Sequence, residues 1–367
     1  MSFWLNRRRF MQAISAAIAA GALSSARPTS AQSSGELRVT VGGGDVGKAT
    51  IEAFVKPFEA ETGIKVTPIT EDANAGAIEL MVKSSNVTLD VGAVGQGSVL
   101  TLEGKGLLEK IDYSIYKKED LDGMYGFAKQ PSGIAWPVYS YNMVYNTESF
   151  PASKPRPMTW ADFWDVEKFP GIRTLVSGAY GSEGPWEEAL LADGVPADQL
   201  YPMDIDRIFT SLDKIKPHIR KWWGTGSEIQ QMLHDKAVDV AQSYDGRALL
   251  LIDQGAPIEI NRNQAKLTWD YFVIPKGGPN VQNAQKYIEF TTRADRQAAF
   301  CQIFPQGPTN RNAFKLIPDK VARKLTTHPD YMTSSVLING QWYNDIGPDG
   351  LTNTERLIQR WNEWVLQ

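Results

Sequence analysis

A glycine-rich turn from Gly42 to Gly47 is the segment of the sequence with the most familiar chemistry. It reads G-G-G-D-V-G after a strand-like segment, and Glu71 and Asp72 end the next expected strand. Glycines let a phosphate approach backbone N–H groups, and an acid at the next strand end binds a ribose hydroxyl. One interpretation is therefore a periplasmic dinucleotide-dependent oxidoreductase. We favour the other, a flexible turn that lines a cleft, because the following helix is expected to begin late, at Lys48.

Side chains that catalyse reactions or bind metals are few and scattered. Cys301 is the only cysteine, and the three histidines lack the spacing of a shared metal site. Glu187 and Glu188 are neighbours on an expected helix and should face different ways, unlike the carboxylate pair of a glycosidase. Neither a nucleophile elbow nor a P-loop occurs. We expect no metal, no cofactor and no enzymatic activity.

The elements that position these residues alternate between strands and helices. Residues 37–41 alternate apolar and polar side chains as in a strand, and residues 51–58 show helical spacing that ends at Gly63. A second series begins with a strand at 173–176. This alternation predicts an α/β fold with a parallel sheet covered by helices, and 367 residues favour two lobes. The other expected strands are 64–69, 89–94, 238–243 and 268–275, and the other expected helices are 75–84, 98–104, 160–169, 205–215, 227–233, 281–293 and 351–366.

Ligands of open α/β sheets bind beyond the carboxyl ends of the strands. The turns expected there include 42–45 and 95–97, which contain Gly43 and Gln96. A glycine lets the ligand reach the backbone, and Gln96 offers a polar side chain. Thr225 begins an expected helix, where its hydroxyl either caps the helix or donates to an anion.

The first 31 residues have the pattern of an export signal. Arg7, Arg8 and Arg9 precede a bulky apolar residue and a weakly hydrophobic run, and small residues lead to Ala31. We expect a twin-arginine signal peptide that is cleaved after Ala31, and a soluble, monomeric periplasmic protein. An amphipathic N-terminal helix is the other interpretation. Removing the segment's four arginines from the 38 basic residues leaves 34 against 42 acidic ones, unlike a binder of nucleic acids or anionic membranes.

Three segments resemble a known family. Residues 58–66 read FEAETGIKV, which is common in extracellular solute-binding proteins. Residues 270–275 read DYFVIP and residues 339–347 read NGQWYNDIG, and both are similar to segments of the spermidine/putrescine-type group. The resemblance implies a two-lobed Venus-flytrap fold with crossing hinge strands, an amine-bearing ligand and an ABC permease as partner. It implies lobes at 36–138 with 269–315, and at 139–268 with 316–367.

The resemblance also implies roles for individual residues. Asp270 falls on the acid that meets a ligand ammonium group, and Tyr244 takes the place of an aromatic wall residue. Arg247 stands where the relatives have a second acid, so it would repel a diamine but fits a carboxylate. This departure favours an ω-amino acid such as 4-aminobutyrate over a polyamine, unless Arg247 turns outward or pairs with Asp245 or Asp270. Tyr343 falls on a polar cleft contact.

Overall fold

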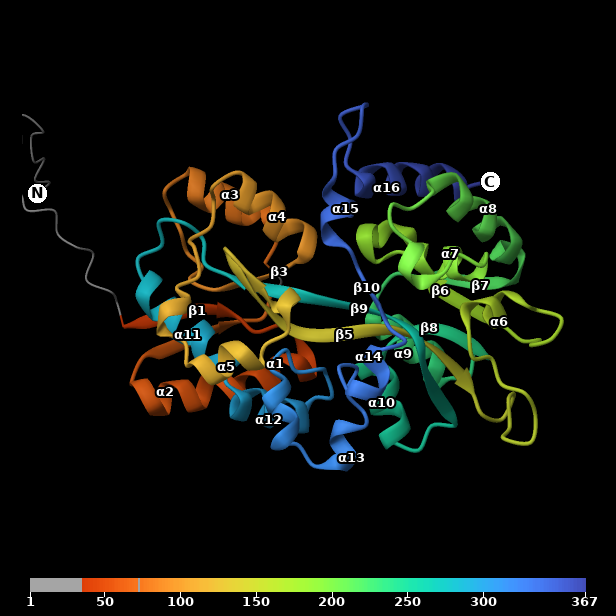
Figure 1. Ribbon diagram of the computed structural model, residues 1–367, viewed down its shortest axis with the longest axis horizontal. Helices are drawn as coiled ribbons and strands as arrows, with labels where there is room; N and C mark the ends of the chain where they lie inside the picture. Colours follow the sequence, from red (N-terminus) through yellow and green to blue (C-terminus); the bar gives the residue numbers. More distant parts are fainter. Residues whose placement is uncertain (1–34, 72) are drawn as a thin grey trace, which may run out of the picture. The chain divides into compact units, whose positions relative to one another are not determined.

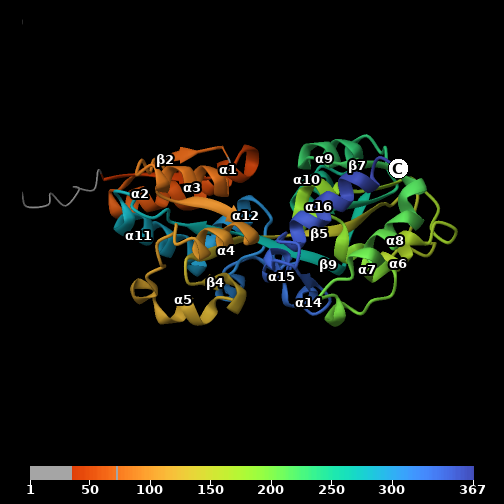
Figure 2. The same cartoon turned by 90° about the horizontal axis from the view of Figure 1, so that it is seen from above.

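Two long strands, β5 (Gly133–Asn146) and β9 (Ile258–Val273), run side by side through the middle of the structure (Figure 1). The computed structural model describes residues 35–71 and 73–367. The predicted signal peptide 1–31 and Asp72 lie outside the described residues. Within them, α/β elements gather into two lobes, one at each end of the β5–β9 pair (Figures 1 and 2).

Short strands and helices make up the rest of the two lobes. The other strands are β1 (Glu36–Thr40), β2 (Lys65–Ile69), β3 (Gly92–Gly95), β4 (Lys129–Gln130), β6 (Arg173–Val176), β7 (Ile219–Trp223), β8 (Val240–Tyr244) and β10 (Val336–Leu337). The helices are α1 (Gly44–Thr50), α2 (Lys56–Thr62), α3 (Ala75–Lys83), α4 (Gln96–Gly104), α5 (Lys118–Gly123), α6 (Trp160–Trp164), α7 (Trp186–Ala192), α8 (Ile205–Ile215), α9 (Gly226–His234), α10 (Asp245–Asp253), α11 (Val281–Thr292), α12 (Ala294–Ile303), α13 (Asp319–Ala322), α14 (Pro329–Met332), α15 (Gly340–Asn344) and α16 (Asn353–Trp364). None of the helices in these ranges has the length and apolar character needed to cross a membrane.

The main sheet is mixed rather than parallel. Its strand order is β10-β9-β5-β8-β6-β7, with β3 also paired to β9, while β1 and β2 form a separate parallel pair. Strand β6 runs parallel to β7 and β8, but β5 is antiparallel to β8 and β9. The predicted parallel sheet is therefore wrong at its centre. The chain crosses between the lobes on β5 and returns on β9 in the opposite direction, so these two strands pair antiparallel.

Aromatic side chains form much of the core of the first lobe. Phe54, from the π-helical turn that joins α1 and α2, packs against Trp136 and Phe300 with ring centroids 5.5 and 5.4 Å apart. Helix α2 ends at Gly63, whose φ of 71° is the left-handed conformation that glycine tolerates best. The predicted helix stop at this residue is confirmed.

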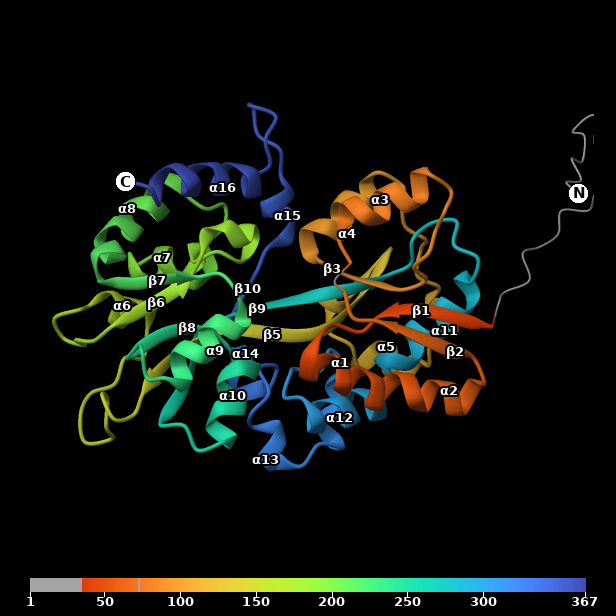
Figure 3. The ribbon, with the colours of Figure 1, turned by 180° about the vertical axis from the view of Figure 1, so that it is seen from behind.

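The sheet of the second lobe is covered on both faces (Figure 3). Helices α6, α7, α8 and α16 bury one set of side chains against it, and α9 and α10 bury another on the opposite face. Helix α8 has the predicted bounds, because apolar residues recur along one face and the Asp204 side chain accepts the Arg207 N–H at 3.0 Å as its N-cap.

The helix predicted at 160–169 ends five residues early. Asp165 leaves the helical conformation, and its carboxylate accepts the Lys168 N–H at 2.9 Å to form a turn. The buried Arg173 guanidinium donates to the carbonyls of Phe163, at 2.8 Å, and Phe169. A longer helix would use the Phe163 carbonyl internally, so the contact with Arg173 replaces the helical hydrogen bond.

Candidate ligand-binding site

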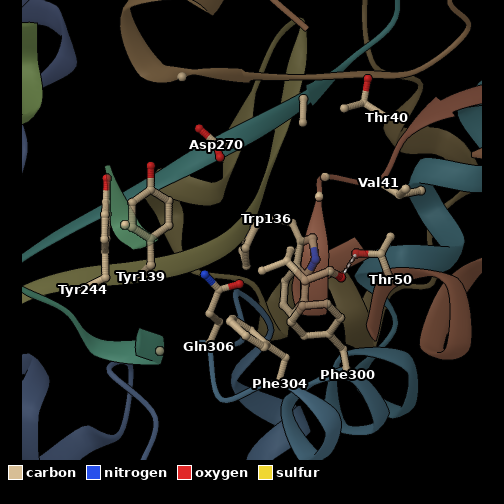
Figure 4. Close-up of a pocket in the computed structure, with 18 of the residues that line it drawn as sticks. Thr40, Val41, Thr50, Trp136, Tyr139, Tyr244, Asp270, Phe300, Phe304 and Gln306 are labelled. Atoms are coloured by element: carbon tan, nitrogen blue, oxygen red, sulfur yellow. Dashed lines mark hydrogen bonds between the residues drawn. The ribbon is translucent and has the colours of Figure 1, made fainter. Parts of the chain in front are cut away.

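A cavity of about 500 Å³ lies between the two lobes (Figure 4). The turn after β1, strand β3 and the end of α12 form its wall in the first lobe. The start of α10 and Gly226 of α9 form its wall in the second lobe. Strands β5 and β9 cross behind it, and contribute Tyr139 and Asp270. The cavity therefore lies where several strands end, as expected for an α/β fold.

Two aspartates and one arginine line this cavity, Asp245, Asp270 and Arg247. Asp270 lies on β9 and pairs with Gly95 of β3 across the ladder. Arg247 lies on the first turn of α10, where its Nη1 donates to Gln230 Oε1 at 3.1 Å. A Cβ atom on Gly226 would lie 3.2 Å from Arg247 Nε, so the absence of a side chain there leaves room for the guanidinium.

Asp245 has a partner of its own. Its buried carboxylate accepts the Gly246 N–H at 2.8 Å, and Arg262 Nη1 lies 3.5 Å away. Burial raises the pKa of Asp245, while the Arg262 charge opposes the shift. The cation beside Asp245 is thus Arg262 of β9, which leaves the Arg247 guanidinium on the cavity wall.

Aromatic rings form two regions of the cavity wall. Tyr139 and Tyr244 lie together near Asp270, with ring centroids 6.0 Å apart. Trp136 and Phe300 lie toward the other end, in a T-shaped contact with centroids 4.8 Å apart. Such rings give a ligand apolar contact, and the tyrosines add hydroxyl groups.

Two buried oxygen atoms in the lining lack a hydrogen-bond partner among the described residues. They are Thr40 Oγ1, at the end of β1, and Gln306 Oε1. A buried polar atom without a partner costs free energy, and a bound ligand or water removes that cost. Both residues line the cavity, although the two oxygen atoms themselves are buried.

Three of the predicted ligand contacts lie outside the cavity lining. Gln96 begins α4, where Nε2 donates to Thr268 Oγ1 at 3.4 Å, and it lines a separate hollow. Thr225 caps α9 by accepting the Glu228 N–H at 3.1 Å. Tyr343 is buried and donates to Glu187 Oε1 at 2.7 Å. The structure gives each of these side chains a partner within the protein.

The lining also contains residues that the sequence did not indicate as contacts. Thr40 could have been found, since it lies two residues before the predicted turn that contains Gly43, and both line the cavity. Phe300, Phe304 and Gln306 follow no strand in the sequence. They reach the cavity because the end of α12 packs in the core of the first lobe, and no sequence signal marks that position.

The glycine turn leads directly into helix α1. Contrary to the expected start at Lys48, α1 begins at Gly44. A Cβ atom on Gly47 would lie 2.2 Å from the Gly42 carbonyl oxygen, so this close approach requires glycine. The third glycine of the motif thus lets the helix pack against the turn.

Glu187 and Glu188 do not diverge as predicted. Both carboxylates reach the buried Lys266 Nζ, at 3.1 and 2.9 Å. Burial lowers the pKa of Lys266, but the two glutamates together raise it above its ordinary value. Burial raises the pKa of Glu188 to about 7. Across the described ranges, no group of three or more His, Cys, Asp or Glu side chains could hold a metal ion.

Two α/β lobes joined by crossing strands, with a ligand-sized cavity between them, define a two-lobed binding protein. Residues 53–329 match the model of the bacterial extracellular solute-binding protein family. The chain is 31% identical over 336 residues to the gamma-aminobutyric acid-binding protein of Pseudomonas aeruginosa, and the match covers 90% of each chain. The chain belongs to this family of bacterial extracellular solute-binding proteins.

Solved structures of relatives share the fold over nearly their whole length. An ABC transporter substrate-binding protein from Bradyrhizobium japonicum superposes with a TM-score of 0.80 at 31% identity, covering 90% of this chain and 99% of that one. A GABA receptor superposes with a TM-score of 0.79 at 32% identity, covering 90% and 97%. The predicted two-lobed α/β fold and the family are confirmed.

Proposed function

We propose that the protein captures a small ω-amino acid, such as 4-aminobutyrate, for an ABC importer. The observation that carries this proposal is the presence of Asp270 and Arg247 in the lining of one cavity, on different elements. A carboxylate pairs with a ligand ammonium group, and a guanidinium matches the two oxygens of a ligand carboxylate. The names of the Pseudomonas relative and the GABA receptor support this choice of ligand.

A diamine is the second candidate, because the sequence resembles the spermidine/putrescine-type group. A protein of that name from Escherichia coli is 25% identical over 299 residues, covering 80% of this chain and 83% of that one. Arg247 argues against a diamine, since its charge would repel the second ammonium group. The two candidates therefore predict opposite effects of removing Arg247.

The test is titration calorimetry with 4-aminobutyrate and putrescine. Wild type should prefer 4-aminobutyrate, and Arg247→Ala or Asp270→Asn should weaken its binding by about thirtyfold or more, since truncating a buried charged partner costs about 2–5 kcal/mol. Arg220→Ala is the matched control, because this exposed arginine of the second lobe lies away from the cavity. A wild-type preference for putrescine, or an Arg247→Ala variant that binds 4-aminobutyrate normally, would contradict the ω-amino acid.

Lobe closure is the proposed means of capture. The lobe limits expected from the sequence place the hinge between residues 138 and 139 on β5 and between 268 and 269 on β9. Val138 pairs with Trp269 and Tyr139 with Thr268, so both limits fall at one level of the ladder. A ligand that contacts both lobes stabilises the closed form by its differential affinity.

The remaining features of the proposal follow from this role. The protein would act as a soluble periplasmic monomer that delivers its ligand to an inner-membrane permease, after export and cleavage behind Ala31. It would release the ligand unchanged, without a cofactor. Mass spectrometry of the ligand recovered after incubation checks this point, and product accumulation would contradict it.

A further inference from the structure

Three tyrosines and one glutamate form a connected group behind the cavity wall. Tyr139 and Tyr141 lie on the same face of β5, and Tyr141 pairs with Tyr244 of β8 across the ladder. The Tyr139 hydroxyl donates to Glu183 Oε1 at 3.0 Å, and the Tyr141 hydroxyl donates to Glu183 Oε2. The hydroxyl oxygens of Tyr141 and Tyr244 are 2.8 Å apart. Tyr139 and Tyr244 line the cavity, whereas Glu183 lies outside its lining.

The direction of these hydrogen bonds follows from the number of protons. Burial raises the pKa of Glu183, while the hydrogen bonds from Tyr141 and Tyr139 and the Lys266 charge oppose this shift and favour the ionised form. An ionised carboxylate only accepts, and each tyrosine hydroxyl has one proton to donate. Tyr139 uses its proton on Glu183, while the Tyr141 hydroxyl has two acceptors within reach, Glu183 and the Tyr244 oxygen. Burial raises the pKa values of all three tyrosines well above the ordinary range, so their hydroxyls stay protonated. The Tyr139 oxygen therefore keeps its lone pairs for a hydrogen-bond donor in the cavity.

The charged groups behind the tyrosines also favour a hydrogen-bond donor in the cavity. Lys266 lies over the Tyr141 ring, with Nζ 5.1 Å from its centroid, and it is shared by Glu187 and Glu188. The Lys266 charge also acts on the Glu183 carboxylate, whose hydrogen bonds come from Tyr139 and Tyr141. The Asp270 charge raises the pKa values of both Tyr139 and Tyr244, so it acts on the same corner of the cavity.

We propose that Glu183 is a positioning residue that makes the corner formed by Tyr139, Tyr244 and Asp270 selective for a ligand ammonium group. It does so by holding the Tyr139 proton away from the cavity, without touching the ligand itself. A glutamine at this position would donate to one hydroxyl and turn its proton toward the ligand. The inference rests on the proposed function, since it places the amine end of the ω-amino acid.

The test compares 4-aminobutyrate with 4-hydroxybutyrate, which carries a hydroxyl in place of the amine at the end opposite the carboxylate. A hydroxyl donates or accepts, so it is nearly indifferent to the direction of the tyrosine protons. Glu183→Gln should lower the preference for 4-aminobutyrate over 4-hydroxybutyrate, measured by competition, by about tenfold, which corresponds to about 1.4 kcal/mol. Glu259→Gln is the matched control, because Glu259 also accepts from a tyrosine hydroxyl, that of Tyr145 at 2.7 Å, and both residues lie outside the cavity lining. An unchanged preference in Glu183→Gln, or an equal loss in Glu259→Gln, would overturn the proposal.

Tyr139→Phe keeps the ring and removes the hydroxyl, and it provides a test if Glu183→Gln fails to fold. Alone it should weaken 4-aminobutyrate binding by about fivefold or more, as expected for the loss of one hydrogen bond to a charged group. In combination with Glu183→Gln it should add little, because both changes act through the same hydroxyl. Normal binding by Tyr139→Phe, or additive effects, would refute the role of Glu183. A wild-type protein that binds no amine would instead refute the proposed function, and this inference with it.

Discussion

Lys266 shows how a charged residue becomes part of a protein core. Its side chain is 1% exposed, and Nζ contacts the carboxylates of Glu187 and Glu188 and the Gly184 carbonyl at 2.6 Å. A buried ion pair adds little net stability over apolar packing, but losing one partner leaves an uncompensated charge. The charges of the two buried glutamates are therefore compensated by this single lysine.

Lys266→Met should lower the free energy of unfolding by about 3–5 kcal/mol near pH 8. The loss should be smaller near pH 5. With its pKa raised to about 7, Glu188 contributes stability that is fully present below its ordinary pKa of 4.5 and is lost as the pH rises through 7. Removing Lys266 raises this pKa further and deepens the loss at high pH.

Urea unfolding at the two pH values measures this effect. Lys214→Met is the control, because Lys214 is 58% exposed and its ion pair with Asp193 lies at the surface. It should change stability by less than about 1 kcal/mol at either pH. A Lys266→Met variant whose loss is the same at pH 5 and pH 8 would contradict the assigned charge pattern.

The elements differ in how well the sequence predicts them. Helix α8 and the stop of α2 at Gly63 follow local signals, a periodic apolar face with caps, and both agree with the structure. Strand β9 begins ten residues before its predicted start at 268, because Lys266 and Asn261 are polar yet buried. Partners far away in the sequence make that burial tolerable, so a local pattern gives no sign of it.

The residues of the candidate site also differ in how well the sequence predicts them. Gly43, in the turn after an expected strand, is predictable as part of the cavity lining, whereas Tyr244, Asp270 and Arg247 came from family resemblance. Gln96 also follows a strand, yet it lies outside the lining. The direction in which a turn side chain points depends on the packing of both lobes, which the sequence does not show.

One glycine at the start of the 3-10 segment Gly178–Glu183 is needed for the packing of helix α16. A Cβ atom on Gly178 would lie 2.3 Å from Trp361 Cδ2 and 2.5 Å from Trp186 Cη2. Gly178→Ala should therefore lower the free energy of unfolding by about 1–3 kcal/mol, because the indole rings must shift.

Thermal or urea unfolding tests this prediction. Gly104→Ala is the control, since a Cβ atom at the last residue of α4 would meet no atom within 4 Å. This control should be neutral or more stable by up to about 1 kcal/mol, because alanine restricts the unfolded chain. Equal stability of Gly178→Ala and wild type would show that the two tryptophans adapt at no cost.

At the scale of the whole molecule, the N-terminal arginines are expected to direct export. The proposed twin-arginine route predicts that changing Arg7, Arg8 and Arg9 together to Lys leaves the precursor in the cytoplasm. Cell fractionation and mass spectrometry of the N-terminus measure the location and the start of the mature chain. Arg27→Lys, outside the paired arginines, should be exported normally. Normal periplasmic yield of the triple variant would contradict the route, and a mature start far from Gln32 would contradict the cleavage site.

The single cysteine gives the molecule a practical use. Cys301 is buried in α12, its thiol donates to the Gln306 carbonyl at 3.1 Å, and burial raises its pKa far above the ordinary value. A protonated, inaccessible thiol reacts slowly with alkylating dyes. A cysteine introduced at exposed Ser227, next to the cavity residue Gly226, would then be the only site that takes up a fluorophore. Because that position adjoins the cavity lining, the labelled protein would serve as an optical sensor of its own ligand.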